Sequence, residues 1–77
     1  MQSFDNLLQD YSLTIQWGIT HGATYQEMKQ GNEMLHIFCQ FFIDGSSYST
    51  SDKSSMKQRL DLLKEALNQE IEHFFTR

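Results

Sequence analysis

The sequence predicts a small α+β domain in which a three-stranded antiparallel sheet is followed by one long helix. Two observations carry this fold class: a helical apolar period in the C-terminal third, and a strand-like alternation that ends at an Asp-Gly pair near the middle. The chain has 77 residues, of which 39% are hydrophobic and 21% charged, as is ordinary for one globular domain. We therefore expect residues 1–77 to form a single domain.

The C-terminal third carries the clearest pattern, because its apolar residues recur at spacings of three and four, the period of one helix face. They are Met56, Leu60, Leu63, Leu67, Ile71 and Phe74. No Gly or Pro interrupts residues 53–75, and either Ser51 or Asp52 is a suitable N-cap. The pattern predicts a helix over about residues 53–75.

The segment before this helix carries a hairpin signal. Asp44-Gly45 tolerates the positive φ of a type I′ turn, and Gln30-Gly31-Asn32 supplies a second turn upstream. Between the two turns, apolar side chains occupy every second position, which is the period of a strand. They are Leu35, Ile37, Cys39, Phe41 and Ile43. These features predict strands over about residues 23–30, 33–44 and 46–51.

The N-terminal stretch fits two structures. Apolar residues alternate with polar ones from residue 11 to residue 19, and the β-branched residues there favour a strand. A helical period with Ser3 as N-cap fits as well. The residues on this period are Phe4, Leu7, Leu8, Tyr11, Ile15 and Ile19. The dipeptide His21-Gly22 is typical of a helix C-terminus, where Gly takes the left-handed conformation.

Composition narrows the class of protein. A net charge of −4 disfavours non-specific attraction to nucleic acid or to anionic membranes. The single cysteine, Cys39, cannot form a disulfide framework, and its apolar neighbours predict a buried, unreactive thiol. No segment reaches the roughly 18–20 apolar residues of a membrane span, and no signal peptide is evident. We expect an intracellular protein, cytoplasmic or nuclear, with no membrane partner.

The sequence offers no set of residues for catalysis or metal binding. No serine lies in a Gly-x-Ser-x-Gly turn, and the four glycines do not form a phosphate-binding loop. Three scattered histidines, His21, His36 and His73, together with one cysteine, lack the spacing of a zinc site. We expect a binding protein rather than an enzyme, with no catalytic residue, metal, cofactor or small-molecule substrate.

Several short motifs, taken in order, resemble those of the double-stranded RNA-binding domain. They are Leu7-Leu8-Gln9-Asp10-Tyr11, Tyr25, Gly31 followed by Phe38, Gly45, and Asp52-Lys53-Ser54-Ser55-Met56-Lys57. The chain thus resembles a divergent member of this family over about residues 3–67. The resemblance implies an α-β-β-β-α fold, in which a three-stranded antiparallel sheet packs against two helices. It also implies that the N-terminal stretch is a helix, over about residues 3–18.

The resemblance implies three RNA-facing surfaces. Their residues here are Asn6, Gln9 and Asp10 on the first helix, Asn32 in the turn, and Lys53 and Lys57 at the last helix. The chain departs from the family in that turn, where Gly-Pro-x-His is replaced by Gly31-Asn32-Glu33-Met34. Lys53 and Lys57 also fit a solvated helix face, which is the simpler interpretation, so RNA contact and plain solvation both stay open.

Two apolar faces predict contact with another protein. Leu13 and Trp17 project from the first helix away from its core side, and Met34, Phe38 and Phe42 form the second apolar face of the central strand. The favoured function is protein–protein interaction or homodimerisation within an RNA-processing assembly. Direct, weak, sequence-independent binding of double-stranded RNA is the alternative. A third possibility is an unrelated small acidic protein that inhibits a basic partner.

Overall fold

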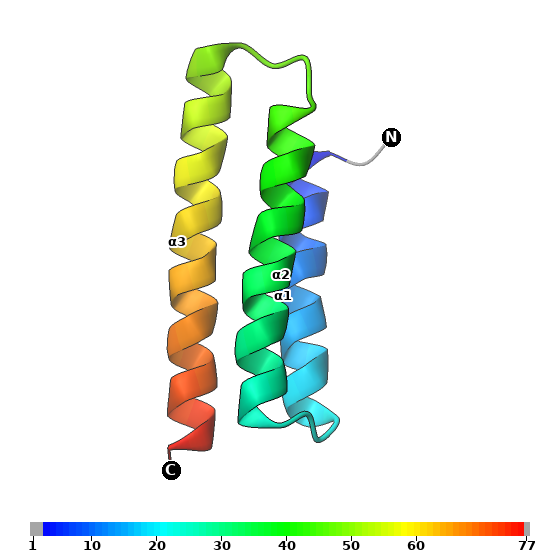
Figure 1. Ribbon diagram of the computed structural model, residues 1–77, viewed down its shortest axis with the longest axis vertical. Coiled ribbons are helices and arrows are strands. Elements are labelled where there is room, and N and C mark those ends of the chain that lie inside the picture. Colours follow the sequence, from blue (N-terminus) through cyan, green and yellow to red (C-terminus); the bar gives the residue numbers. More distant parts are fainter. Residues whose placement is uncertain (1–2, 77) are drawn as a thin grey trace.

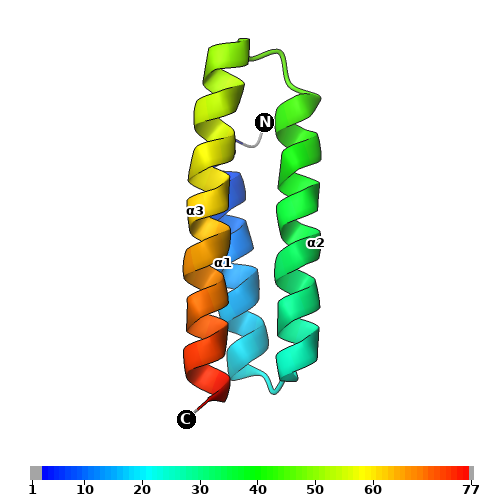
Figure 2. The same ribbon diagram turned by 60° about the vertical axis from the view of Figure 1, so that its left-hand side comes forward.

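In the computed structural model, residues 3–76 are described, and they form three consecutive antiparallel α-helices (Figure 1). α1 spans Phe4–Thr20, α2 spans Tyr25–Asp44 and α3 spans Thr50–Phe75. The three helices run alongside one another, and each packs against the other two (Figure 2). α2 and α3 pack most extensively. The two ends of the predicted domain, residues 1–2 and 77, lie outside the described residues.

The predicted α+β class is wrong, because the described part of the chain contains helices and no strand. The strands expected over residues 23–30 and 33–44 fall within one continuous helix, α2, apart from residues 23–24, which precede it. The strand expected over 46–51 is the α2–α3 loop and the start of α3. The α-β-β-β-α arrangement implied by the family resemblance, with its sheet packed against two helices, is wrong for the same reason.

A capping box starts α2 where a strand was expected. The Thr24 side chain accepts a hydrogen bond from the Glu27 backbone N–H, and the Glu27 carboxylate accepts one from the Thr24 N–H. Four backbone donors of a helix start lack intrahelical partners, and this reciprocal pair satisfies two such groups at once. The box therefore favours helix at the position where the strand prediction began.

Gly45 ends α2 rather than turning a hairpin. Its φ is −83° and its ψ is −2°, and its backbone N–H donates to the carbonyls of Phe41 and Ile43. A type I′ turn requires positive φ at both central residues, so the hairpin prediction at Asp44-Gly45 is wrong. The Asp-Gly pair lies at a helix C-terminus, a position that favours glycine as well.

The predictions of the first and last helices are confirmed. Ser3 caps α1 by accepting a hydrogen bond from the Asn6 N–H, and Gly22 follows α1 with a left-handed φ of +85°. α3 covers the whole predicted range and starts three residues earlier, at Thr50. Its N-cap is Ser49, not Ser51 or Asp52, and the Ser49 hydroxyl accepts from the Asp52 N–H.

The core runs along the bundle axis and draws on all three helices. Its buried apolar residues are Phe4, Leu7, Tyr11, Ile15, Met28, Cys39, Ile43, Met56, Leu60, Leu67 and Ile71. Cys39 is buried as predicted, and burial raises the pKa of its thiol. Consecutive core residues on each helix are three, four, seven or eleven apart, which are the spacings that keep side chains on one face of a helix.

Candidate protein interface

The outer face of α2 carries four exposed apolar side chains, here named the α2 ridge: Met34, Ile37, Phe38 and Phe41. Their exposed fractions are 70%, 47%, 61% and 72%. The spacing i, i+3, i+4, i+7 places them on one face over two helical turns, about 10 Å along the axis. Single exposed apolar residues are normal on protein surfaces, but a contiguous patch is typical of an interaction site.

The α2 ridge lies opposite the side of α2 that faces the core. Asn32, His36, Cys39 and Ile43 point inward on that side and are buried. At 100° per residue, the centre of the ridge is about half a turn away from the centre of this buried set. A helix that is buried on one side and apolar on the opposite side is ordinarily covered on both. In this bundle α1 and α3 cover one of them.

Charged pairs between α2 and α3 border the ridge. Glu33 lies one turn before Ile37 and accepts from the Lys64 ammonium at 3.0 Å, which lowers the pKa of its carboxyl group. Asp44 lies one turn after Phe41 and pairs with Lys57 at 2.7 Å. Both contacts join exposed or partly exposed side chains, so solvent screening leaves each with only a small contribution to stability.

Further carboxylates continue this border along α3. Asp61 is within 2.7 Å of the His36 ring Nε2, and its side chain is 66% exposed. Glu65 is exposed one turn further along, where it lines a shallow hollow with Asp61 and Leu62. The α3 side of the ridge therefore carries more negative than positive charge.

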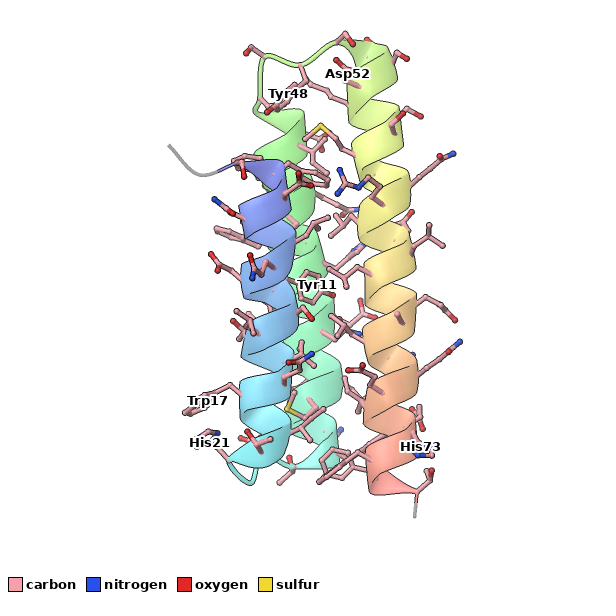
Figure 3. All side chains as sticks on the ribbon, turned by 180° about the vertical axis from the view of Figure 1, so that it is seen from behind. Tyr11, Trp17, His21, Tyr48, Asp52 and His73 are labelled. Carbon is pink, nitrogen blue, oxygen red and sulfur yellow. The ribbon has the colours of Figure 1, made fainter. Side chains whose placement is uncertain are left out.

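The structure separates the residues predicted for a protein interface. Met34 and Phe38 belong to the α2 ridge, whereas Phe42 is half-buried and packs against the core. Leu13 and Trp17 are exposed on α1, a different helix, and the Trp17 ring stacks on His21 with ring centroids 4.1 Å apart. Figure 3 shows Trp17 and His21 pointing away from the bundle.

Sequence reasoning missed Ile37 and Phe41 as partners of Met34 and Phe38. The strand period assigned them to the opposite face, together with Leu35, Cys39 and Ile43. A helical period would have grouped all four ridge residues. The Thr24-x-x-Glu27 capping box was the signal for that period.

The residues implied as RNA contacts do not form one surface. Asn6, Gln9 and Asp10 are exposed on α1. Asn32 is 1% exposed, because it lies inside the bundle beneath Tyr11. Lys53 donates to the Asp44 backbone carbonyl at 3.2 Å, and Lys57 pairs with the carboxylate of the same residue.

Every lysine and arginine in residues 3–76 has an acceptor within the protein. Four of them form ion pairs: Lys29 with Glu72, Lys57 with Asp44, Arg59 with Asp5, and Lys64 with Glu33. Lys53 is held by the Asp44 carbonyl. Phosphate binding by a duplex-binding protein requires cations directed outward, whereas these are directed at neighbouring helices.

The remaining polar contacts tie the helices together. The Tyr25 hydroxyl donates to the Glu72 carboxylate, which also accepts from Lys29 at 3.0 Å. These two donors lower the pKa of Glu72, and the hydrogen bond between Tyr25 and Glu72 is the main cause that raises the pKa of Tyr25.

An open groove between the C-terminal ends of α1 and α3 is lined by Ile19, Ala66 and Phe74 with polar residues around them.

Within residues 3–76, no three His, Cys, Asp or Glu side chains come together in a way that could hold a metal ion. None of the helices in the same range combines the length and the apolar composition needed to cross a bilayer. Comparisons with protein family models, with curated proteins and with solved structures found no match for this chain.

Proposed function

We propose that this chain is a non-catalytic protein-binding module that holds its partner on the α2 ridge. The observation that carries the proposal is the exposure of Met34, Ile37, Phe38 and Phe41 along one helix face. Exposure of large apolar side chains to water is unfavourable, and their burial against a partner surface lowers the free energy. Aromatic residues and methionine are also the types enriched at protein interfaces.

The size of the ridge predicts a modest affinity unless other contacts add to it. Burying one fully exposed side chain of this kind contributes about 1.5–3 kcal/mol. The four ridge residues are already partly buried, with exposed fractions of 47% to 72%, so together they contribute at most about 4–8 kcal/mol. Association costs an estimated 4–15 kcal/mol in translational and rotational freedom. The two ranges overlap, so polar contacts at the border decide how tightly a partner is held.

The RNA-processing setting and direct binding of duplex RNA are not retained. Both came from a family resemblance whose implied sheet is replaced here by α2 and the following loop. The turn residue of the RNA surface, Asn32, lies in the bundle interior, and Lys53 and Lys57 are bound to Asp44. Protein binding remains as the proposed role.

Photo-cross-linking with a matched control position tests the proposal. A photoreactive benzoylphenylalanine is placed either at Phe41 on the ridge or at Leu62 on α3. The two native side chains are equally exposed, at 72% and 71%. In cells that naturally make the protein, position 41 is expected to give discrete cross-linked protein bands that are absent or much weaker at position 62. Equal yields from both positions would contradict the proposal.

A further inference from the structure

We infer that the partner on the α2 ridge is an amphipathic helix whose apolar face is bordered by Lys or Arg. This inference rests on the protein-binding role proposed above. The shape of the ridge gives the first reason. Met34, Ile37, Phe38 and Phe41 form an exposed apolar stripe along one face of α2. A second helix with apolar residues three and four apart can interdigitate with such a stripe over the same two turns.

Charge at the border of the ridge gives the second reason. Glu33 and Asp44 adjoin the ridge on its α3 side, and Asp61 and Glu65 continue the border on α3. Glu27 lies on the same side of α2 as Met34, two turns before it. Of these five carboxylates, Glu33 and Asp44 pair with Lys64 and Lys57. Asp61 contacts the His36 ring and Glu27 accepts from the Thr24 N–H, so neither of these two is paired with a Lys or Arg.

Acidic residues outnumber basic ones over the whole described part of the chain as well. Residues 3–76 hold all ten Asp and Glu residues but five of the six Lys and Arg residues, because Arg77 lies outside this range. All five described cations already contact acceptors within the protein. A partner that brings cations therefore finds excess carboxylates, whereas a partner that brings carboxylates finds no cation without an acceptor in this range.

The same charges disfavour a second copy of the chain as the occupant. In a two-fold symmetric dimer whose α2 helices run antiparallel, the α3 sides of the two copies face each other, so Asp61 and Glu65 of one copy would approach the acidic border of the other. Each copy also carries a net charge of −4. Juxtaposed like charges oppose association, while a basic border on the partner favours it and speeds the encounter.

Three synthetic helical peptides test the inference. They share one apolar face with Leu at i, i+3, i+4 and i+7, and carry Lys, Gln or Glu at the flanking positions, with helical content matched by circular dichroism. The wild-type protein is expected to bind the Lys peptide at least about tenfold more tightly than the Glu peptide at low salt, and this preference is expected to shrink as salt rises.

Protein variants separate ridge docking from general attraction to an acidic protein. Phe38→Gln/Phe41→Gln is expected to lose most of the binding to the Lys peptide, whereas Leu62→Gln, at an equally exposed apolar site, retains it. Glu27→Gln/Glu65→Gln is expected to reduce the preference for Lys over Glu. Binding of the Lys peptide that survives Phe38→Gln/Phe41→Gln would overturn the inference.

The remaining outcomes keep the inference and the proposed function distinguishable. Equal binding of all three peptides, lost in Phe38→Gln/Phe41→Gln, would leave the ridge as a docking site and overturn the basic partner. Failure of all three peptides, with cross-links from position 41 to a second copy of the chain, would replace the basic helix with a homodimer. Failure of the peptides together with absence of cross-links at position 41 would overturn both.

Discussion

The Tyr11 hydroxyl donates a hydrogen bond to the Asn32 backbone carbonyl at 2.9 Å and also contacts the Asn32 side-chain oxygen. The Asn32 amide nitrogen in turn donates to the Lys64 carbonyl at 3.2 Å. One buried amide thus joins α1, α2 and α3. Burial raises the pKa of Tyr11 well above its ordinary value, so its hydroxyl stays protonated as a donor.

Replacing Tyr11 with Phe tests this contact. Tyr11→Phe keeps the ring but leaves the buried Asn32 side-chain oxygen without its donor, so we expect the free energy of unfolding to fall by about 1–3 kcal/mol. In a domain of this size each kcal/mol lowers the Tm by about 4–8 °C. Urea denaturation measures the effect. Tyr48→Phe, at an exposed tyrosine, is the control, and equal stability of the two variants would contradict the buried contact.

Replacement of glycine by alanine is expected to have opposite effects on stability at Gly31 and at Gly22. Gly31 lies within α2, and a Cβ atom there would meet no atom within 4 Å. We expect Gly31→Ala to raise the free energy of unfolding by about 0.5–1 kcal/mol, because Gly loses more backbone entropy in a helix than Ala does.

Gly22 also has open space around it, but its φ of +85° is rarely adopted by residues with a Cβ atom. Gly22→Ala is therefore expected to lower the free energy of unfolding by about 1 kcal/mol. Urea denaturation of both variants beside wild type gives the two signs. Stabilisation by Gly22→Ala would show that the turn between α1 and α2 does not depend on the left-handed conformation.

The sequence predicted α3 and, with the help of a resemblance, α1, because their inward positions are mostly apolar. Met56, Leu60, Leu67 and Ile71 repeat with a helical period that no polar residue interrupts. The helical period of α1 competed with an alternation over residues 11–19. Ser3 and Gly22 marked the two ends of this helix correctly, because caps depend on local chemistry rather than on distant contacts.

The prediction of α2 failed because polar residues occupy its core face. Asn32 and His36 point inward and are buried, with Tyr11, Lys64 and Asp61 as partners from other helices. These partners are 21 to 32 residues away in the chain, so no local pattern reveals that the two polar residues belong inside. In the sequence, the ridge residues Ile37 and Phe41 fall between Leu35, Cys39 and Ile43 at every second position. This spacing imitates the period of a strand.

Half of the candidate interface could be predicted from the sequence. An apolar face containing Met34 and Phe38 was expected on a strand and is present on a helix. Ile37 and Phe41 were assigned to the wrong face, since a change of period from 2 to 3.6 regroups the side chains. The acidic border could not be predicted, because Asp61 comes beside α2, where it contacts His36, only through the packing of α3 against α2.

Polar replacements on the α2 ridge are expected to leave the fold intact. Phe38 and Phe41 are 61% and 72% exposed, so Phe38→Gln/Phe41→Gln should change the free energy of unfolding by about 0.5 kcal/mol or less per site. Ile43→Ala, at a fully buried position on the other face of the same helix, should cost about 2–5 kcal/mol. Thermal denaturation compares them. A large loss from the ridge variant would mean that the ridge supports the fold rather than a partner.

Acid is expected to weaken the fold through three glutamates. The pKa of Glu27 is lowered by hydrogen bonds from Thr24, that of Glu33 by Lys64, and that of Glu72 by Tyr25 and then Lys29. Each folded-state pKa lies below the ordinary value of 4.5, so the ionised form is favoured by folding. Their contribution to stability is therefore fully present above that value and is lost as the pH falls through the folded-state pKa values.

Urea denaturation between pH 7 and pH 3 measures this loss. The free energy of unfolding should fall below about pH 4.5 in the wild type, and the variant Glu27→Gln/Glu33→Gln/Glu72→Gln should show a smaller fall, because its neutral amides do not change charge. Glu65→Gln/Glu70→Gln, at exposed positions on α3, is the control and should keep the wild-type profile. An equally steep fall in the triple variant would assign the acid sensitivity to other carboxylates.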